Sequence, residues 1–343
     1  MKITILIDNY NYDEYVVKAV DSALGQTYKN VEVIVVDDGS TDSCPEILRQ
    51  YESRVKVILK KNGGQGSAFN AGVAAATGDV VMFLDADDLL RPDAAALVAA
   101  AWRPGVSKIH YPLDVIDEVG NSLGAVIPRV QLPSGNLSQE VLQRGFYVSS
   151  PTSGNTFSRE ILNTVMPITD ENEWRMGAEG YLVFLAPFFG EIVTIPEKIA
   201  YYRIHGKSVT AMNGTGSMDS SRMEKLLQSD IRLRRTLERF SAEHQLTLSP
   251  QAVYSHWLHR KLRLACYKIS REVHPFAGDT AARLAWSLVR AVWAAEELGL
   301  RSRVFFSGWA MLTALLPTQM AAPLIRLAFS PAARPAFFKR IIG

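Results

Sequence analysis

The first hundred residues alternate short apolar runs with stretches of helical periodicity. The apolar runs mix few polar positions among their β-branched residues, which is typical of strands buried on both faces of a parallel sheet. These runs are residues 3–7, 31–36, 55–59 and 80–84. Helical patterns lie between and after them, at residues 13–24, 45–51, 66–76 and 92–102. Each strand therefore leads into a helix, and the pattern predicts a layered α/β fold.

The pattern changes twice further along the chain. From residue 105 to about 210 it loosens into loops rich in Pro, Gly and Ser, with a helix predicted at 180–189 and a strand at 192–195. After a Gly-rich break near residue 213 the chain becomes helical. Helices are predicted at 218–244, 250–270 (with Ser249 as its cap) and 279–298, followed by a last segment. We therefore predict two domains, 1–212 and 213–343, the first with halves 1–104 and 105–212.

Composition narrows the class of protein. The 343 residues carry 37 Lys and Arg against 35 Asp and Glu, so the net charge of +2 offers no general attraction for nucleic acid. Cys44 and Cys266 form no metal-type or redox-type spacing, which favours a reducing compartment and predicts a cytoplasmic protein. The apolar run at residues 3–7 is too short for a signal peptide.

Acidic residues follow three of the four predicted strands. Asp8 comes after the first, Asp37 and Asp38 after the second, and Asp85, Asp87 and Asp88 after the fourth. Because ligands of open α/β sheets bind at the carboxyl ends of strands, these acids are expected at one rim. Their mutual repulsion calls for a cation, and a divalent ion carrying phosphate oxygens fits best.

Glycines occur after the third strand, in the loop 63–66, and not after the first. The turn after the first strand lacks the G-x-G-x-x-G pattern of dinucleotide-binding folds, and no P-loop is present. The glycine loop alone is a weak signal, because a plain turn before a helix uses the same residues.

Five motifs in order resemble those of the family 2 glycosyltransferases, which have a GT-A fold. They are Tyr10-Asn11, Gln26-Thr27, VEVIVVDDGSTD (residues 31–42), NGGQGSAFNAGVAAATGD (62–79) and VMFLDADDLLRPD (81–93). A sparser similarity covers residues 178–210, whereas the C-terminal region carries no family signal. The resemblance implies a GT-A domain, Rossmann-like with a mostly parallel sheet flanked by helices, at residues 1–212. Its first half would bind the nucleotide-sugar and its second half the acceptor.

The resemblance also implies roles for single residues. Asp85 and Asp87 match the DXD motif and would bind Mg²⁺ or Mn²⁺, with Asp87 the more direct ligand and Asp85 also in contact with the nucleotide, while Asp88 orients the loop. The remaining nucleotide contacts would come from Asp8, Tyr10, Asp38, Gly64 and Arg203. In that set Tyr10 stacks on the base, Asp38 accepts the imide N–H of uracil and Arg203 neutralises phosphate charge.

Two further positions in the second similar stretch carry predicted chemistry. Glu179 aligns with the carboxylate that acts as general base, although Asp170, Glu171 and Glu173 lie close in sequence. His205 would contact phosphate or the metal.

The implied activity is inverting, metal-dependent transfer of a sugar, with UDP-sugar as the expected donor. The acceptor would be a hydroxyl of a glycan or lipid-linked molecule in cell-surface polysaccharide or glycoconjugate synthesis. Two alternatives remain open at this stage: a nucleotidyltransferase-like enzyme that uses sugar nucleotides, and a non-catalytic, membrane-docked scaffold with the same core.

The C-terminal region raises the question of membrane contact. The predicted helix 250–270 is basic and amphipathic, which fits either an anionic membrane surface or packing on the catalytic domain with a solvated basic face. Residues 304–325 are uncharged over a length that could span a bilayer, but Pro317 and Pro323 interrupt them. We favour two short interfacial or docking helices there, at the cytoplasmic face of the membrane.

Overall fold

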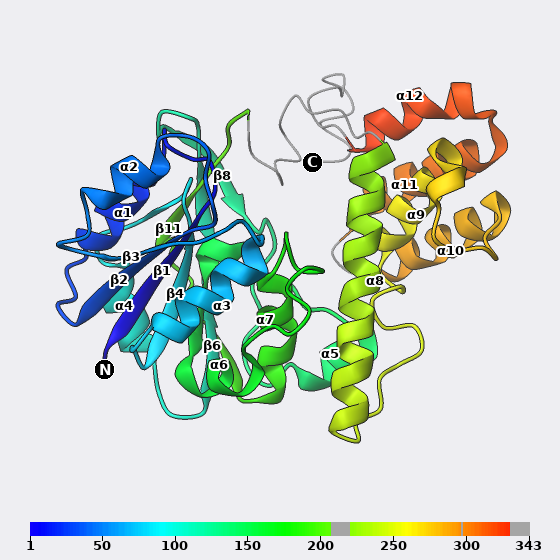
Figure 1. Ribbon diagram of the computed structural model, residues 1–343. Helices are drawn as coiled ribbons and strands as arrows, with labels where there is room; N and C mark the ends of the chain where they lie inside the picture. Colours follow the sequence, from blue (N-terminus) through cyan, green and yellow to red (C-terminus); the bar gives the residue numbers. More distant parts are fainter. Residues whose placement is uncertain (207–219, 296–297, 330–343) are drawn as a thin grey trace. The chain divides into compact units, whose positions relative to one another are not determined.

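A mixed seven-stranded sheet lies at the centre of the first of two units in the computed structural model (Figure 1). The structure describes residues 1–206, 220–295 and 298–329. The first unit comprises residues 1–141 and 147–203, and the second comprises 142–146 with the described residues from 204 onward. The predicted boundary near residue 213 lies outside the described residues.

The strand order of this sheet is β10-β6-β9-β4-β1-β2-β3. Strand β9 runs antiparallel to its neighbours β4 and β6, and the other pairs are parallel. The bounds are β1 Ile3–Asn9, β2 Val31–Asp37, β3 Lys56–Leu59, β4 Val80–Asp85, β6 Val106–His110, β9 Asn155–Ser158 and β10 Glu191–Thr194. The four strands predicted in the first hundred residues are confirmed, and so is the mostly parallel sheet.

Helices cover both faces of the sheet. They are α1 Val16–Leu24, α2 Cys44–Arg49, α3 Gln65–Ala75 and α4 Ala94–Ala101. Helices α1 and α2 lie on one face and α3 on the other (Figure 1). At Gly72 helix α3 lies so close to β1 that a Cβ atom would stand 2.2 Å from Leu6 Cδ1. The rings of Phe69 and Phe83 meet edge to face beneath this helix, with centroids 4.6 Å apart.

The segment expected to be mostly loops contributes three of the four strands of a second sheet, of strand order β5-β11-β7-β8. Its strands are β5 Leu89–Leu90, β7 Leu113–Ile116, β8 Ser122–Ile127 and β11 Ala200–Arg203. Helices here are α5 Ser138–Arg144, α6 Arg159–Val165 and α7 Glu179–Leu185, with 3₁₀ turns at Thr152–Gly154 and Ala186–Phe188. The predicted helix 180–189 and strand 192–195 correspond to α7 with its 3₁₀ turn and to β10.

The second unit is helical, as predicted. Its elements are α8 Ser220–Glu243, α9 Trp257–Ile269, a 3₁₀ turn Arg271–Val273, α10 Ala281–Ala294, α11 Leu300–Leu315 and α12 Thr318–Phe329. Their shared core includes Leu264, Leu288, Phe306, Trp309 and Ile325. None of the described helices combines the length and the apolar character that a membrane crossing requires.

Helix α9 begins seven residues later than predicted and does not offer a free basic face. Its N-cap is His256, whose ring Nδ1 accepts the backbone N–H of Leu258, and not Ser249. The cations of α9 are held inside the helical unit: Lys261 Nζ lies 4.3 Å from the Phe329 ring centroid, and Lys268 donates to the Leu316 carbonyl oxygen. The solvated basic face predicted for this helix is therefore wrong, whereas its contact with a membrane or with the catalytic domain stays a prediction.

Candidate active site

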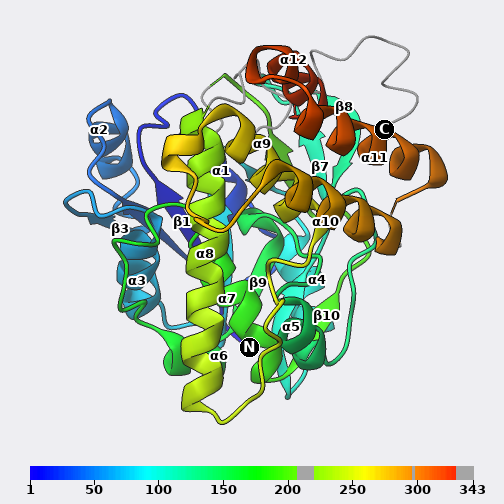
Figure 2. The same ribbon diagram turned by 90° about the vertical axis from the view of Figure 1, so that its right-hand side faces the viewer.

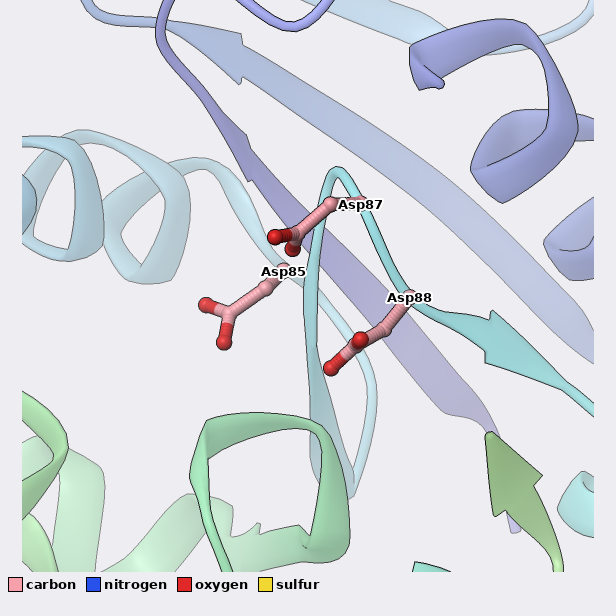
Figure 3. Close-up of side chains that lie close together, drawn as sticks. All are labelled: Asp85, Asp87 and Asp88. Atoms are coloured by element: carbon pink, nitrogen blue, oxygen red, sulfur yellow. The ribbon is translucent and has the colours of Figure 1, made fainter. Parts of the chain in front are cut away.

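Three aspartates gather at the carboxyl end of β4. Asp85 ends the strand, and Asp87 and Asp88 follow in the turn before β5. One carboxylate oxygen from each lies within 4.8 Å of the others, and all three side chains extend to the same side of the turn (Figure 3). Burial, followed by the charges of neighbouring acids, raises the pKa values of Asp85 and Asp88 well above the ordinary value. Such an oxygen-only, charge-rich set fits a hard divalent cation.

Asp8 extends this cluster from the neighbouring strand. It stands opposite Asp85 in the parallel register of β1 and β4. Burial raises the pKa of Asp8 to about 7, although a hydrogen bond from Gln65 works in the opposite direction. Its Oδ1 atom is buried and has no hydrogen-bond partner among the described residues. The structure therefore brings Asp8 and the DXD carboxylates together, as the sequence predicted.

Gln65, which the sequence analysis did not assign, links this cluster to α7. Its Nε2 donates to Asp8 Oδ2 at 3.3 Å and to Asp85 Oδ1 at 3.4 Å. Its Oε1 accepts the backbone N–H of Ala178 at 2.9 Å, directly before Glu179. One amide thus connects the acids of the sheet to the N-terminus of the helix that carries the predicted base.

Glu179 is the first residue of α7 and is half-buried. The negative charge of Glu179 contributes to the raised pKa of Asp85, so the Glu179 side chain lies close enough to interact electrostatically with the aspartate cluster. Among the alternatives, Glu171 accepts a hydrogen bond from Asn70 of α3, while Asp170 and Glu173 are exposed. The assignment of Glu179 as the base stays a prediction, and this arrangement favours it over its neighbours.

Asp38 and Gly64, both predicted to contact the nucleotide, contact each other. The buried Asp38 carboxylate accepts the backbone N–H groups of Gly63 at 2.9 Å and Gly64 at 2.5 Å and pairs with Lys60 Nζ at 2.7 Å. The Gly63 N–H also lies 3.2 Å from the second carboxylate oxygen, so each oxygen of Asp38 already accepts two contacts within the protein. The role of Asp38 toward a uracil base stays a prediction, and its present role is to hold the glycine loop.

The glycine loop is closed by backbone from the 174–175 segment. Gln65 N and Gly66 N, at the start of α3, donate to the carbonyl oxygens of Arg175 and Trp174. Gly64 adopts φ of +87°, and a Cβ atom there would stand 2.5 Å from the Arg175 Cα. This crowding explains why glycine is required. The predicted contact of Gly64 with a nucleotide stays a prediction.

Two tyrosines follow β1. Tyr10 is 46% exposed, which leaves its ring accessible as a stacking surface, and that role stays a prediction. Tyr12 is half-buried, and burial together with the charges of Asp87 and Asp85 raises its pKa. Tyr12 therefore lies in the electrostatic field of the acidic site. Sequence analysis did not assign it a role, and its position directly after the Tyr10-Asn11 motif was the one feature of the sequence that pointed to this site.

Arg203, at the end of β11, holds the DXD turn in place. The residue is 1% exposed, and its guanidinium donates to the carbonyl oxygens of Asp87 at 2.7 Å and Glu118 at 2.9 Å. Its backbone N–H donates to Asp88 Oδ1 at 2.8 Å. Its predicted contact with a diphosphate stays a prediction. His205 is buried and is grouped with the second unit, so its predicted metal or phosphate contact also stays a prediction.

Comparison with known proteins agrees with this geometry. The model of the family "Glycosyl transferase family 2" matches residues 4–137. An uncharacterized glycosyltransferase of Nostoc sp. is 38% identical over 228 residues, which cover 64% of this chain and 70% of that protein. The chain belongs to glycosyltransferase family 2.

Other similarities to this glycosyltransferase are partial. Chondroitin synthase of Escherichia coli is 42% identical over 124 residues, which cover 35% of this chain and 18% of that protein. The crystal structure of TarS from S. aureus matches with a TM-score of 0.50 at 15% identity, over 95% of this chain and 55% of that one. The fold is thus a GT-A fold followed by a helical region, as predicted.

Proposed function

We propose that this glycosyltransferase moves a sugar from a UDP-sugar to a hydroxyl group of a glycan or lipid-linked acceptor, with inversion at the anomeric carbon. The observation that carries the proposal is the meeting of Asp85, Asp87 and Asp88 with Asp8 at one rim, next to the start of α7. The proposal places the chain at the cytoplasmic face of a membrane, in cell-surface polysaccharide or glycoconjugate synthesis.

The acidic cluster would hold the donor diphosphate through Mg²⁺ or Mn²⁺. Asp87 and Asp85 are the proposed ligands, with Asp88 fixed behind them by Ser153 and Arg203. Four carboxyl groups in and around one buried site repel each other, and Asp8 Oδ1 has no hydrogen-bond partner among the described residues. Both observations support a cation at this site. When bound, the cation supplies positive charge against the departing diphosphate.

Glu179 supplies the proton transfer in this proposal. A sugar hydroxyl is a weak nucleophile near neutral pH, and a positioned carboxylate base accelerates its attack about 10²–10⁴-fold. Glu179 removes the hydroxyl proton while the acceptor oxygen forms a bond to the anomeric carbon. The bond from that carbon to the diphosphate oxygen breaks, and its electron pair leaves with the diphosphate. Attack from the face opposite the diphosphate produces inversion.

Thermal unfolding of the full chain with and without nucleotides tests the donor site. The melting temperature is measured with UDP, GDP, TDP, CMP and NAD, each with and without Mn²⁺, because a ligand that binds the folded state raises it by mass action. We expect a Mn²⁺-dependent increase with UDP that is absent in Asp87→Ala and kept in Glu52→Ala, which removes an exposed acid. No increase with any nucleotide would contradict the proposal.

Product analysis then separates the reaction types. Release of UDP from a UDP-sugar in the presence of an acceptor, with the opposite anomeric configuration in the product by NMR, is the expected result. Release of pyrophosphate would instead favour a nucleotidyltransferase-like activity. Glu179→Gln is expected to keep UDP binding and to lose transfer, because it alters the base and leaves the donor site intact.

A further inference from the structure

Helix α11 is apolar on two opposite faces. One face packs into the core of the second unit through Phe306, Trp309 and Ala310. The other face carries a stripe of exposed apolar side chains at helical spacing, namely Leu300, Val304, Met311 and Leu315. A helix that is apolar all round is ordinarily buried on all sides. The exposed stripe, on which Leu315 is 77% exposed, therefore indicates a surface that meets something other than water.

Helix α10 places a second stripe beside the first. Its exposed residues Arg283, Trp286, Arg290 and Trp293 recur at spacings of three and four, so they share one side of the helix. Trp293 Nε1 donates to Ser307 Oγ of α11 at 3.1 Å, and the two helices lie side by side (Figure 2). We call these two stripes together the α10–α11 face. It combines aliphatic side chains with indole rings and guanidinium groups.

The charges of this part of the chain distinguish among partners. Residues 280–329 contain five arginines and two acids, Glu296 and Glu297, and the two acids lie outside the described residues. In a symmetric dimer through the α10–α11 face, Arg283 and Arg290 would meet the arginines of a second copy, which disfavours that arrangement. A partner surface with an apolar interior and an anionic boundary would bury the aliphatic side chains, hold the indole rings at the boundary and pair with the guanidinium groups.

We propose that the α10–α11 face binds the surface of a membrane that contains anionic phospholipids. Leu300, Val304, Met311 and Leu315 enter the acyl boundary, and Trp286 and Trp293 lie at the headgroup level. Arg283 and Arg290 pair with lipid phosphates. The inference rests on the proposed function, in that a lipid-linked acceptor would be reached from the surface that this face binds.

Vesicle flotation of the full chain tests the inference. The vesicles are made of phosphatidylcholine, with and without about one third of the anionic lipid phosphatidylglycerol, and are used at low and high salt. We expect binding to the anionic vesicles that falls with salt, because surface charge is screened within about a Debye length. Leu300→Gln/Leu315→Gln should reduce binding at least about tenfold. Arg283→Gln/Arg290→Gln should weaken binding to anionic vesicles and reduce its salt dependence.

Matched controls separate the face from general effects. Leu123→Gln removes a leucine of β8 that is 53% exposed, and Lys29→Gln/Arg54→Gln removes two exposed cations of the first unit. These variants should bind vesicles like the parent chain. Tryptophan fluorescence of the parent chain should shift to shorter wavelength when vesicles are added, because indole rings leave water, and Trp286→Phe should reduce that shift. Unchanged vesicle binding in the double-leucine variant would overturn the inference.

Two further outcomes distinguish the inference from the proposed function. A chain that binds UDP with Mn²⁺ but no vesicles overturns the membrane surface and leaves the glycosyltransferase proposal standing. A chain that binds vesicles but whose melting temperature does not change with any nucleotide supports the membrane-binding face and contradicts the proposed donor site. Sedimentation velocity without lipid completes the test, since a dimer that Leu315→Gln dissociates, together with absent vesicle binding, would reassign the face to self-association.

Discussion

Ser153 Oγ donates a 2.5 Å hydrogen bond to Oδ2 of Asp88, a residue 65 positions earlier in the chain. The same hydroxyl oxygen accepts the backbone N–H of Asp85 at 3.0 Å. The 3₁₀ turn that carries Ser153 therefore fixes both ends of the DXD turn. Arg203 fixes the same turn from β11 through the Asp87 carbonyl oxygen, so the acidic site is held by two segments distant in sequence.

Ser153→Ala is expected to destabilise the protein by about 1–3 kcal/mol, because it removes the donor from a buried carboxylate. It should also weaken Mn²⁺-dependent UDP binding, since Asp85 and Asp88 lose their common anchor. Chemical denaturation and nucleotide titration measure the two effects. Ser53→Ala changes an exposed serine and should alter neither. Equal stability of the two variants would contradict the anchoring role.

Gly64→Ala and Gly105→Ala form a matched pair that separates backbone strain from crowding. Both glycines have positive φ, +87° and +85°, but nothing lies within 4 Å of a Cβ atom built at Gly105. Gly105→Ala should cost only the left-handed backbone strain of about 1–2 kcal/mol. Gly64→Ala should cost more, because its Cβ atom would meet the Arg175 Cα and displace the segment that closes the glycine loop. Similar unfolding midpoints for both would argue against this close approach.

Much of the fold was predictable because the sequence of a buried parallel strand is a continuous run of apolar, largely β-branched residues. The runs that became β1, β2, β3 and β4 also located Asp8, Asp38 and Asp85 at their ends. Apart from the predicted strand that corresponds to β10, the strands after residue 105 escaped prediction because they are only four to six residues long and their pairing is non-local, as for β9 between β4 and β6. Such short segments carry too few positions for a period to emerge.

The same limit applies to single side chains. Gln65 lies within a quoted motif, yet its partner Ala178 is 113 positions away, so sequence spacing gave no hint of the link. Helix α9 shows the converse error. Its cations are visible in the sequence, but the aromatic rings and carbonyl groups that hold them belong to α11, α12 and the loop between them. A basic helical pattern alone therefore does not distinguish a surface helix from one with internal partners.

Gln65→Met should uncouple the acids from α7. The substitution keeps an unbranched side chain of similar length but removes the donor to Asp8 and Asp85 and the acceptor for the Ala178 N–H. We expect a stability loss of about 1–3 kcal/mol and a larger reduction of transfer than of UDP binding. Gln50→Met, at an exposed position, is the control. Transfer and UDP binding that fall by the same factor would show that Gln65 serves the donor site alone.

The raised pKa of Asp8 predicts how metal-free stability depends on pH. Burial raises this pKa from an ordinary 3.8 to about 7, so the folded chain binds a proton that the unfolded chain has released. The free energy of unfolding should therefore fall as pH rises from about 4 to about 7. Asp8→Asn should flatten that fall, and Glu52→Gln should not. Denaturation curves in EDTA at several pH values measure the slope, and an unchanged slope in Asp8→Asn would refute the assignment.

Lys108 supplies a pH dependence of opposite sign away from the acids. Its buried Nζ donates to Ser149 Oγ at 2.6 Å and to Tyr147 Oη at 3.1 Å, and burial lowers its pKa well below 10.5. Between that lowered pKa and about 10.5, the unfolded chain binds a proton that the folded chain lacks. Stability should then rise with pH, by up to about 1.4 kcal/mol per pH unit for one proton.

Lys108→Met removes this contribution while retaining most of the buried apolar stem. We expect the variant to gain less stability than the parent chain between about pH 7 and pH 9, the window in which the unfolded lysine is still charged. Lys29→Met, at an exposed site, should follow the parent curve. If the Lys108→Met slope equals that of the parent, the folded protein keeps Lys108 charged, and Tyr147 and Ser149 solvate an ammonium group rather than a neutral amine.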